Sequence, residues 1–338
     1  MATIAFFELE PWEKDYVKNK LKKHKVIFVD GKLTPENAAK AKTADAVAIF
    51  IYSKVDKQVL AKMPKVKLVA TMSTGFDHID LQACKGKKCL VCNVPTYGDV
   101  TVAEHTFALM LAVSRKIVQA VEKTRSGSFE FEGLMGTDLR GKTLGVVGTG
   151  RIGRNVAHIG GEGFGMKVIA YDMFPNQDLA KECGFAYVPF DKLLAESDVI
   201  TFHVPLTKET THMLNKKNLA KVKKGAILIN TSRGGVIETG AILEGVVKGI
   251  FSGVGLDVLE EEGVMKEELE LLGRPKDKTK IDYRTLLEEH VLVEQPNVIM
   301  TPHSAFYSKE ALLRIVDTTI ENIEAFLAKK PINVIKCG

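Results

Sequence analysis

The chain has 338 residues, 45% of them apolar, which is enough for two folded domains. Its 47 basic residues exceed its 42 acidic residues by only five and form no arginine-rich tract, so we expect no nucleic-acid partner. No apolar stretch reaches the length of a membrane span, the start of the chain is acidic and the cysteines number five, so we expect a cytoplasmic protein with no membrane partner.

Short apolar runs alternate with helix-like stretches along the chain, which is the pattern of α/β folds with parallel sheets. In the first hundred residues, the runs that predict strands are 4–9, 26–30, 46–51, 68–73 and 90–95. Helices are expected between them, for example over 14–23 and 56–63. These elements belong to the first of two predicted sheets.

A long amphipathic helix is predicted over 101–127, with Gly127 at its end and an apolar face suited to a core or a subunit contact. Beyond it, a second series of strands is predicted over 143–148, 167–172, 186–190, 198–203, 226–230, 253–258 and 298–303. The two series predict two sheets, with the long helix as the bridge. We interpret the charged residues 259–290 as an insertion between two strands.

The stretch "TLGVVGTGRIG" places Gly148, Gly150 and Gly153 directly after a predicted strand and at the start of a helix. This spacing is typical of a dinucleotide-binding turn, in which the glycines allow a tight turn, close approach of a pyrophosphate and close packing of helix on strand. Asp172 ends the next strand and suits the hydroxyls of a ribose, whereas it would repel a 2′-phosphate. The alternative is an ordinary glycine turn, but the context favours NAD as the cofactor.

Three polar residues follow predicted strands of the same series: Arg233, Glu262 and His303. Ligands of open parallel sheets bind at the carboxyl ends of strands. A guanidinium suits a carboxylate, and a glutamate beside an imidazole favours its protonated form, which suits a general acid. Beside a nicotinamide, the set predicts hydride transfer at a carbon next to a carboxylate, with His303 as the acid and base.

Each of these residues also has a plainer interpretation. The arginine is also compatible with a helix cap, the histidine with a core position, and Glu260, Glu261 and Glu262 with a solvated surface. Taken singly, these interpretations compete well, and for Glu262 the plainer one prevails. Taken together on a dinucleotide-binding fold, the three residues favour catalysis.

Three cysteines, Cys84, Cys89 and Cys92, have the spacing C-x4-C-x2-C, which also occurs at metal clusters. The segment that holds two of them, "CLVCNVP", has the composition of a buried strand, and no fourth ligand lies nearby in the sequence. We therefore interpret the cysteines as packing residues and predict no metal site.

The sequence resembles the D-isomer-specific 2-hydroxyacid dehydrogenases over nearly its whole length. The motifs that carry the resemblance are "STGFDHID", "VAEHTFALML", "LRGKTLGVVGTGRIG", "DVITFHVPLT", "INTSRGGVI", "GLDVLEEE" and "VIMTPHSAF". It implies a Rossmann-type cofactor domain inserted in a flavodoxin-like substrate domain, both with doubly wound parallel sheets. It also implies a cleft between the domains and a homodimer. The expected domains are 1–99 and 304–338 for the substrate, and 100–303 for NAD.

The resemblance assigns roles to individual residues. It places the family's catalytic residues on Arg233, Glu262 and His303. The implied cofactor contacts are Gly148, Gly150, Arg151, Ile152, Gly153, Asp172, His203, Pro205, Thr231 and Asp257. The backbone of Thr74 and Gly75 matches the loop that receives the substrate carboxylate.

Within the family, the chain is most similar to the D-lactate dehydrogenase branch. Tyr52, Tyr97 and Phe306 match aromatic residues around a small apolar pocket in that branch, which predicts interconversion of D-lactate and pyruvate. Gly98 and Asp99 depart from the family's usual residues, which bears on substrate size. The alternatives are a related enzyme acting on glyoxylate, hydroxypyruvate, a longer 2-keto acid or phosphoglycerate, and an NADH-sensing interaction protein similar to corepressors.

Overall fold

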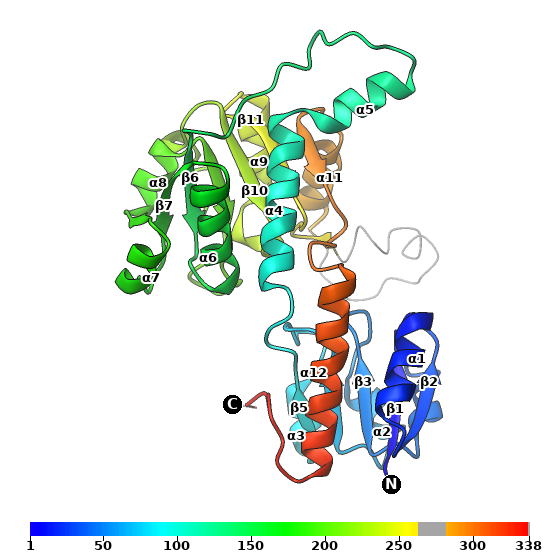
Figure 1. The fold of residues 1–338 in the computed structure, drawn as a ribbon. Coiled ribbons are helices and arrows are strands. Elements are labelled where there is room, and N and C mark those ends of the chain that lie inside the picture. The colour runs from blue at the N-terminus through cyan, green and yellow to red at the C-terminus, as the bar shows by residue number, and fades with distance from the viewer. Residues whose placement is uncertain (263–281, 337–338) are drawn as a thin grey trace. The chain divides into compact units, whose positions relative to one another are not determined.

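The computed structural model describes residues 1–262 and 282–336 and divides the chain into two compact units (Figure 1). Met1–Tyr97 together with Tyr307–Gly338 forms the terminal unit, and Gly98–Phe306 forms the central unit. Each unit has its own parallel sheet and its own hydrophobic core. The predicted fold class, two α/β units with one inserted in the other, is therefore confirmed.

The observed divisions of the chain lie close to the expected ones. The sequence placed them at 99/100 and 303/304, and the structure places them at 97/98 and 306/307. Most of the predicted insertion, residues 263–281, lies outside the described residues.

The terminal unit contains a five-stranded parallel sheet with the strand order β2-β1-β3-β4-β5, which is the flavodoxin-like order. Its strands are β1 (Thr3–Phe7), β2 (Lys25–Val29), β3 (Ala46–Ile49), β4 (Leu68–Thr71) and β5 (Leu90–Cys92). The four residues of β3 and the four of β4 are all buried, because helices cover both faces of the sheet.

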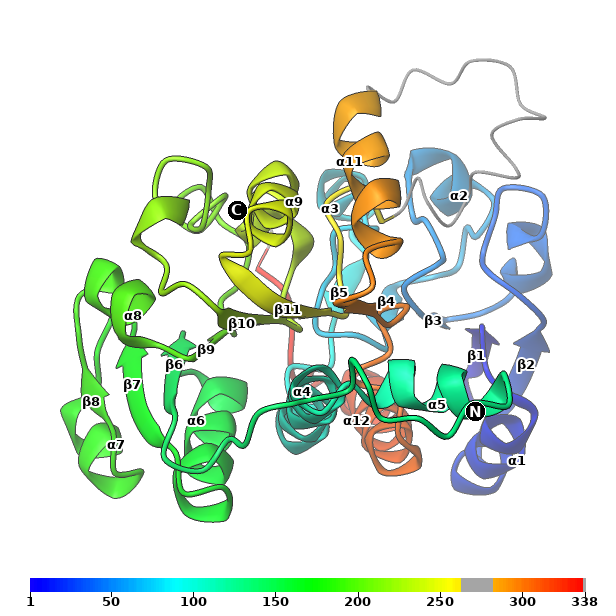
Figure 2. The ribbon, with the colours of Figure 1, turned by 90° about the horizontal axis from the view of Figure 1, so that it is seen from above.

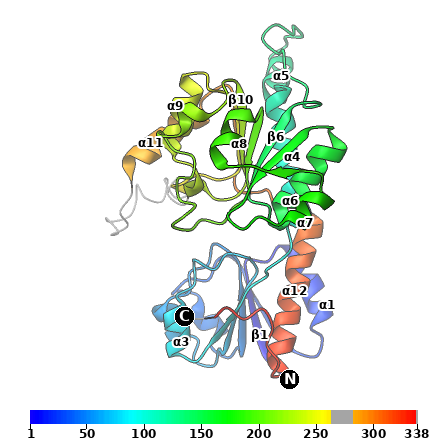
Figure 3. The ribbon, with the colours of Figure 1, turned by 90° about the vertical axis from the view of Figure 1, so that its left-hand side faces the viewer.

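The helices of the terminal unit are α1 (Pro11–Lys20), η1 (Ala38–Ala41), α2 (Lys57–Ala61), α3 (Leu81–Gly86) and α12 (Lys309–Leu327). Side chains of Asp56, Asp80 and Ser308 cap the starts of α2, α3 and α12. α1 begins three residues earlier than predicted, because Glu10 and Glu13 form a capping box and Pro11 occupies the first turn. Figure 3 shows α1 and α12 on one side of β1 and α3 on the other. None of the described helices is long and apolar enough to cross a membrane.

The cysteines of the C-x4-C-x2-C motif lie in the interior of the terminal unit. Cys84, Cys89 and Cys92 are all buried, and the first two belong to the core between the sheet and α2 and α3. Burial raises the pKa of the Cys89 thiol to about 12 and that of Cys92 to about 11. These thiols stay protonated at neutral pH and serve as packing residues, as predicted.

The central unit contains a seven-stranded parallel sheet with the order β12-β11-β10-β9-β6-β7-β8. Its strands are β6 (Thr143–Val147), β7 (Lys167–Tyr171), β8 (Ala186–Tyr187), β9 (Val199–Phe202), β10 (Ala226–Asn230), β11 (Phe251–Leu256) and β12 (Val298–Met300). Numbered from β6, this is the Rossmann order 3-2-1-4-5-6 with one strand added. The order of the strands reverses between β6 and β9, and that reversal marks the crevice where such sheets bind ligands.

Helices cover both faces of the central sheet (Figure 2). Those of the central unit are α4 (Asp99–Ser114), α5 (Ile117–Arg125), α6 (Arg151–His158), η2 (Ile159–Gly163), α7 (Gln177–Glu182), α8 (Phe190–Glu196), η3 (Leu219–Lys221), η4 (Gly234–Val236), α9 (Thr239–Val247) and α11 (Tyr283–Val293). Along β10, Ile227 and Ile229 pack with α4 and α6, whereas Leu228 packs with α8 and α9. This alternation explains why β10 is buried on both faces, as its composition predicts.

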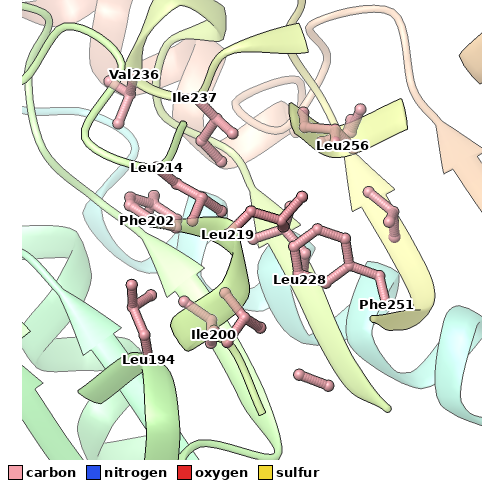
Figure 4. Packing of buried hydrophobic residues seen from close by; sticks show 14 of the residues in the cluster. Leu194, Ile200, Phe202, Leu214, Leu219, Leu228, Val236, Ile237, Phe251 and Leu256 are labelled. Carbon is pink, nitrogen blue, oxygen red and sulfur yellow. The ribbon is translucent and has the colours of Figure 1, made fainter. Parts of the chain in front are cut away.

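The larger of the two cores in this unit lies on the side of α8, α9 and α11 (Figure 4). Strand residues such as Phe202 and Leu228 pack there with Leu194 of α8 and with Leu214 of the loop after β9. The core fixes the carboxyl ends of β9, β10 and β11 relative to one another. These are the ends from which the predicted site residues extend.

The single long helix predicted over 101–127 is wrong, because two helices occupy this stretch. α4 ends at Ser114, and Lys116 adopts a left-handed conformation with φ 51° before α5 begins. The carbonyl oxygen of Ser114 accepts a hydrogen bond from the amide of Thr137 (2.9 Å), so the returning chain takes an acceptor that a continuous helix would use. No residue of α5 is fully buried.

The predicted strand at 186–190 is shorter than expected. Only Ala186 and Tyr187 pair with β7, because Pro189 occupies the N-cap position of α8 and Phe190 begins the helix. The pattern of apolar residues continues across the junction, which is why the sequence extends the strand too far.

Candidate active site

The three glycines after β6 shape a turn that we name the glycine turn (148–153). Gly148 has φ +91°, and a Cβ atom there would lie 2.6 Å from Val204 Cγ1 and 2.7 Å from the carbonyl oxygen of His203. At Gly153, a Cβ atom would lie 1.9 Å from the carbonyl oxygen of Gly148. At Gly150, it would meet nothing within 4 Å. The first and third glycines are thus required by packing, and the second leaves open space before the first turn of α6.

Asp172, directly after β7, is held against the glycine turn. One carboxylate oxygen accepts hydrogen bonds from the amide (2.7 Å) and the hydroxyl (3.0 Å) of Thr149, and the other accepts one from the amide of Phe174 (2.9 Å). The hydroxyl groups of Thr149 and Tyr187 lie 2.7 Å apart. The sequence predicts Asp172 at this place but not the hydroxyls that orient it, since any small or polar residue fits the glycine pattern at position 149.

His203 follows β9, across the strand reversal from the glycine turn. Its Nε2 lies 2.9 Å from Thr201 Oγ1, and its Nδ1 is buried with no hydrogen-bond partner among the described residues. Burial lowers the pKa of His203 to about 3, so the ring is neutral at physiological pH. A buried, unpaired ring nitrogen beside an open turn points to a ligand that supplies the missing partner.

These observations fit a dinucleotide. The open space at Gly150 and the amides that begin α6 suit a pyrophosphate, and the fixed carboxylate of Asp172 suits ribose hydroxyls. The other predicted cofactor residues lie at the same edge of the sheet, at the start of α6 or just after β9, β10 and β11: Arg151, Ile152, Pro205, Thr231 and Asp257. Thr231 is buried, and its hydroxyl lies 3.0 Å from that of Thr106.

Asp257 ties the end of β11 to the segment after β12. Its buried carboxylate accepts hydrogen bonds from the amides of Ser304 and Ala305 (both 2.9 Å) and from the hydroxyl of Thr301 (2.5 Å). His105 Nε2, on α4, lies 3.1 Å from Thr301 Oγ1. These bonds fix the backbone on both sides of position 303.

His303 and Glu262, which are 41 residues apart in the chain, are in direct contact. His303 Nδ1 lies 3.0 Å from each carboxylate oxygen of Glu262. The histidine has φ 53°, a conformation that residues other than glycine rarely adopt and that surrounding bonds must hold. Its Nε2 has no hydrogen-bond partner among the residues that the structure describes. The imidazole is therefore oriented by one nitrogen and has the other available for proton exchange.

Arg233 is an exposed, charged residue in the turn after β10. Its Nη1 donates to the carbonyl oxygen of Ser232 (2.7 Å), and its own carbonyl oxygen accepts from Asn230 Nδ2 (3.0 Å). No described carboxylate pairs with the guanidinium. A Cβ atom at Gly234 would lie 2.0 Å from the carbonyl carbon of Leu259, so the missing side chain lets this turn approach the one after β11. The structure thereby places Arg233 and Glu262 on adjoining turns.

The turn after β11, residues 257–262, is named the acidic turn below. Glu260 accepts hydrogen bonds from the amide (2.6 Å) and hydroxyl (2.7 Å) of Thr239, and its other oxygen lies 2.6 Å from His212 Nε2. The amide of Glu261 donates to Glu289 Oε1 (2.9 Å). Because Glu262 contacts His303, the plainer interpretation of three solvated glutamates is wrong. The sequence offers no signal for Glu289, which lies 28 residues further along.

The predicted substrate residues of the terminal unit lie after β3, β4 and β5. Thr74 donates through its hydroxyl to the carbonyl oxygen of Val94 (2.8 Å), while the amides of Thr74 and Gly75 donate no hydrogen bond within the described part of the chain. Free amides of this kind suit an anion. The carbonyl oxygen of Tyr97 accepts from Arg314 Nε (2.7 Å).

Tyr52 has 58% of its surface exposed, and its amide donates to Glu8 Oε1 (3.0 Å). Glu8, which also accepts from the amide of Phe50 (2.9 Å), is a residue that the sequence does not single out. Phe306, the fifth predicted substrate residue, is the last residue of the central unit and is partly buried. In the central unit, its Cβ would lie 3.9 Å from a Cβ atom added to Gly98.

Comparison with known proteins finds similarity over nearly the whole chain. The family model described as D-isomer specific 2-hydroxyacid dehydrogenase, NAD binding domain, matches residues 107–305. The pyruvate reductase of Chlamydomonas reinhardtii has a TM-score of 0.87 and 36% identity, with 98% of both chains covered. The D-lactate dehydrogenase of Aquifex aeolicus, complexed with NAD and lactic acid, has a TM-score of 0.80 and 38% identity, with 97% of this chain and 96% of that chain covered. A glyoxylate reductase of Thermococcus litoralis is 36% identical over 330 residues, 95% of this chain and 88% of the relative.

Proposed function

Because the chain belongs to the D-isomer-specific 2-hydroxyacid dehydrogenase family, we propose that this NAD-binding oxidoreductase interconverts D-lactate and pyruvate. The contact of Glu262 with His303, on the sheet edge that also carries the glycine turn, is the observation that supports the proposal most directly. It gives a proton donor beside the place where a nicotinamide would be bound. When bound, NADH supplies the hydride that reduces the keto carbon.

The cofactor is held by the backbone and by one carboxylate. We assign the pyrophosphate to the amides that begin α6, where Gly150 leaves open space, and the adenosine ribose to Asp172. The fixed negative charge of Asp172 would repel a 2′-phosphate, which supports the assignment of NAD rather than NADP. We assign the unpaired Nδ1 of His203 to the same cofactor.

We assign the proton transfer to His303. Its free nitrogen, Nε2, donates a proton to the carbonyl oxygen as the keto acid is reduced and removes the hydroxyl proton in the reverse direction. Glu262, 3.0 Å from Nδ1, fixes the orientation of the ring. The strained backbone at position 303 is held by the bonds to Asp257, so the ring is already oriented before the substrate binds.

We assign the substrate carboxylate to Arg233, whose planar guanidinium forms two parallel hydrogen bonds with such a group. In the terminal unit, taken by itself, the amides of Thr74 and Gly75 can also donate hydrogen bonds to a carboxylate. Tyr52, Tyr97 and Phe306 are assigned to the side chain of the substrate. Aromatic residues of this size favour a methyl group over a phosphorylated chain, which supports pyruvate over phosphohydroxypyruvate.

The experiment that tests the proposal follows the loss of NADH absorbance with a panel of 2-keto acids: pyruvate, glyoxylate, hydroxypyruvate, a branched longer acid and phosphohydroxypyruvate. We expect the highest kcat/KM with pyruvate. A higher value with glyoxylate would favour the activity of the Thermococcus litoralis relative. NADH binding without oxidation by any acid would favour a sensor over an enzyme.

We also propose that the chain forms a homodimer through α5. Three apolar side chains of this helix are partly exposed in the single chain: Ile117 (49%), Val118 (39%) and Val121 (40%). Val121 is four residues after Ile117 and three after Val118, so it neighbours both on the helix surface. A contiguous apolar face rimmed by polar residues is typical of a subunit contact. Sedimentation of the wild type and of Val121→Asp distinguishes a dimer from a monomer, and an identical mass for both would contradict the assignment.

A further inference from the structure

Glu289, on α11, is a buried carboxyl group for which the proposed reaction has no use. Its side chain is fully buried, yet one oxygen, Oε2, has no hydrogen-bond partner among the described residues. The other oxygen accepts the amide of Glu261 at 2.9 Å. A buried polar group with half of its hydrogen-bonding capacity unused calls for an explanation, because an apolar residue of similar size would fill the same space without that cost.

We propose that Glu289 is a positioning residue for the proposed dehydrogenase reaction: by holding the amide of Glu261, it fixes the acidic turn so that Glu262 meets His303. This inference rests on the proposed function of that pair. It assigns to Glu289 no contact with substrate or cofactor.

The bonds of the acidic turn support this role. The three consecutive glutamates have different tasks: the side chain of Glu260 is bound by Thr239 and His212, the backbone of Glu261 is bound by Glu289, and the side chain of Glu262 meets His303. The acidic turn is therefore held at Glu260 and Glu261, the two residues that precede Glu262. Thr239 begins α9 and Glu289 lies on α11, and both helices contribute residues to the same core.

Glu289 and its neighbour Glu288 lie in different electrostatic surroundings. Burial, together with the nearby carboxylates of Glu260 and Glu261, raises the pKa of Glu289 to about 7. Its neighbour Glu288 has a different setting, since it pairs with Arg284 at 3.2 Å and lies 3.9 Å from Lys216 at the protein surface. Two adjacent residues of one helix thus offer a test residue and a matched control.

Three substitutions test the inference. Glu289→Leu removes the acceptor for the Glu261 amide, and Glu289→Gln keeps it in an uncharged group of the same shape. Glu288→Gln removes a surface carboxylate one residue away. We expect Glu289→Leu to lower kcat for pyruvate roughly 10- to 100-fold, as small misplacements of catalytic groups do, with KM for NADH unchanged. We expect Glu289→Gln to restore kcat to within about threefold of the wild type and Glu288→Gln to leave it unaltered.

Crystal structures of the Leu and Gln variants give a measurement that does not depend on turnover. We expect the distance between Glu262 and His303 Nδ1 to stay near 3.0 Å in the Gln variant and to exceed hydrogen-bonding range in the Leu variant. If the Leu variant does not fold, Glu289→Met, which keeps an unbranched chain of similar volume, takes its place.

An unchanged contact together with unchanged kcat in the Leu or Met variant would overturn the inference, as would equal losses in the Leu and Gln variants. The proposed function can fail separately. If the wild type reduces no 2-keto acid while the contact still depends on Glu289, then Glu289 positions the pair but the reaction assigned to the pair is wrong.

Discussion

Two turns at the carboxyl edge of the central sheet are built in opposite ways. The glycine turn after β6 is shaped by missing side chains, because a single added carbon at Gly153 would lie 1.9 Å from a carbonyl oxygen. The acidic turn after β11 is shaped by side chains that reach it from other segments, among them Thr239, Glu289 and His303. The first turn therefore fails when an atom is added, and the second when a hydrogen bond is removed.

This difference separates the two tasks of the site. A cofactor that is bound through its phosphates needs free backbone and open space, which glycine supplies. Proton transfer needs an imidazole and a carboxylate in fixed orientation, which only a network of side chains supplies. Substitutions in the two turns should accordingly affect different measurements, and the following predictions use that separation.

The largest effect is expected from Gly153→Ala. The added methyl group would force α6 away from β6, so we expect a lower melting temperature and the loss of measurable NADH binding. Gly150→Ala is the comparison, because its added carbon meets no protein atom within 4 Å, and it should weaken NADH binding while leaving the melting temperature nearly unchanged. Fluorescence titration and thermal unfolding measure the two quantities. Equal behaviour of the two variants would break the distinction between a packing glycine and a ligand glycine.

His303→Asn should act on turnover alone. Asparagine tolerates the left-handed backbone of this position but has no group that exchanges a proton near neutral pH. We expect kcat for pyruvate to fall roughly 10²- to 10⁴-fold, the usual contribution of general acid–base catalysis, with the dissociation constant of NADH unaltered. If NADH binding were lost as well, proton transfer and cofactor binding would not depend on separate parts of the site.

Glu289 makes the free energy of unfolding depend on pH. Its pKa is raised from 4.5 to about 7, so the folded protein holds a proton that the unfolded chain releases between these values. Stability from this group is present below about pH 4.5 and is lost as the pH rises to about 7. Relative to that of Glu289→Gln, the free energy of unfolding of the wild type should fall by roughly 3 kcal/mol across this range, at about 1.4 kcal/mol per pKa unit. Urea unfolding of both proteins at several pH values measures this difference. The same pH dependence in both proteins would contradict the raised pKa of Glu289.

The smallest effect is expected from Asp172→Asn. Asparagine keeps an oxygen that accepts the amide of Thr149 but removes the charge that would repel a 2′-phosphate. We expect the ratio of kcat/KM for NADPH to that for NADH to rise roughly tenfold, in line with the loss of one unfavourable charge contact. Asp178→Asn, on α7, serves as the control. An unaltered preference for NADH would show that the cofactor choice is made elsewhere.

The glycine turn was predictable from sequence because its requirements are local. Gly148, Gly150 and Gly153 lie within six residues, and a positive φ at the first, open space at the second and close packing at the third all follow from the missing side chain. The position of Asp172 follows from the next strand. The fold was predictable for a similar reason, since strands of buried parallel sheets consist of nearly continuous runs of apolar residues.

The acidic turn was predictable only in part. Arg233, Glu262 and His303 were predicted as strand-end residues, but the partners of Glu260 and Glu261 lie 21 to 48 residues away in the chain. Only the tertiary fold decides which carboxylate meets which donor. The break between α4 and α5 escaped prediction because the apolar pattern continues past Lys116, and the cause of the break is an amide of the returning chain.

The most direct test of the whole account is the configuration of the product. Pyruvate, NADH and the protein are incubated together, and the lactate formed is resolved by chiral chromatography. We expect D-lactate alone, in amounts equal to the NADH consumed, and none with His303→Asn over the same time. Formation of L-lactate or of a racemate, or an undiminished yield with His303→Asn, would contradict the assignment of the reaction to this site.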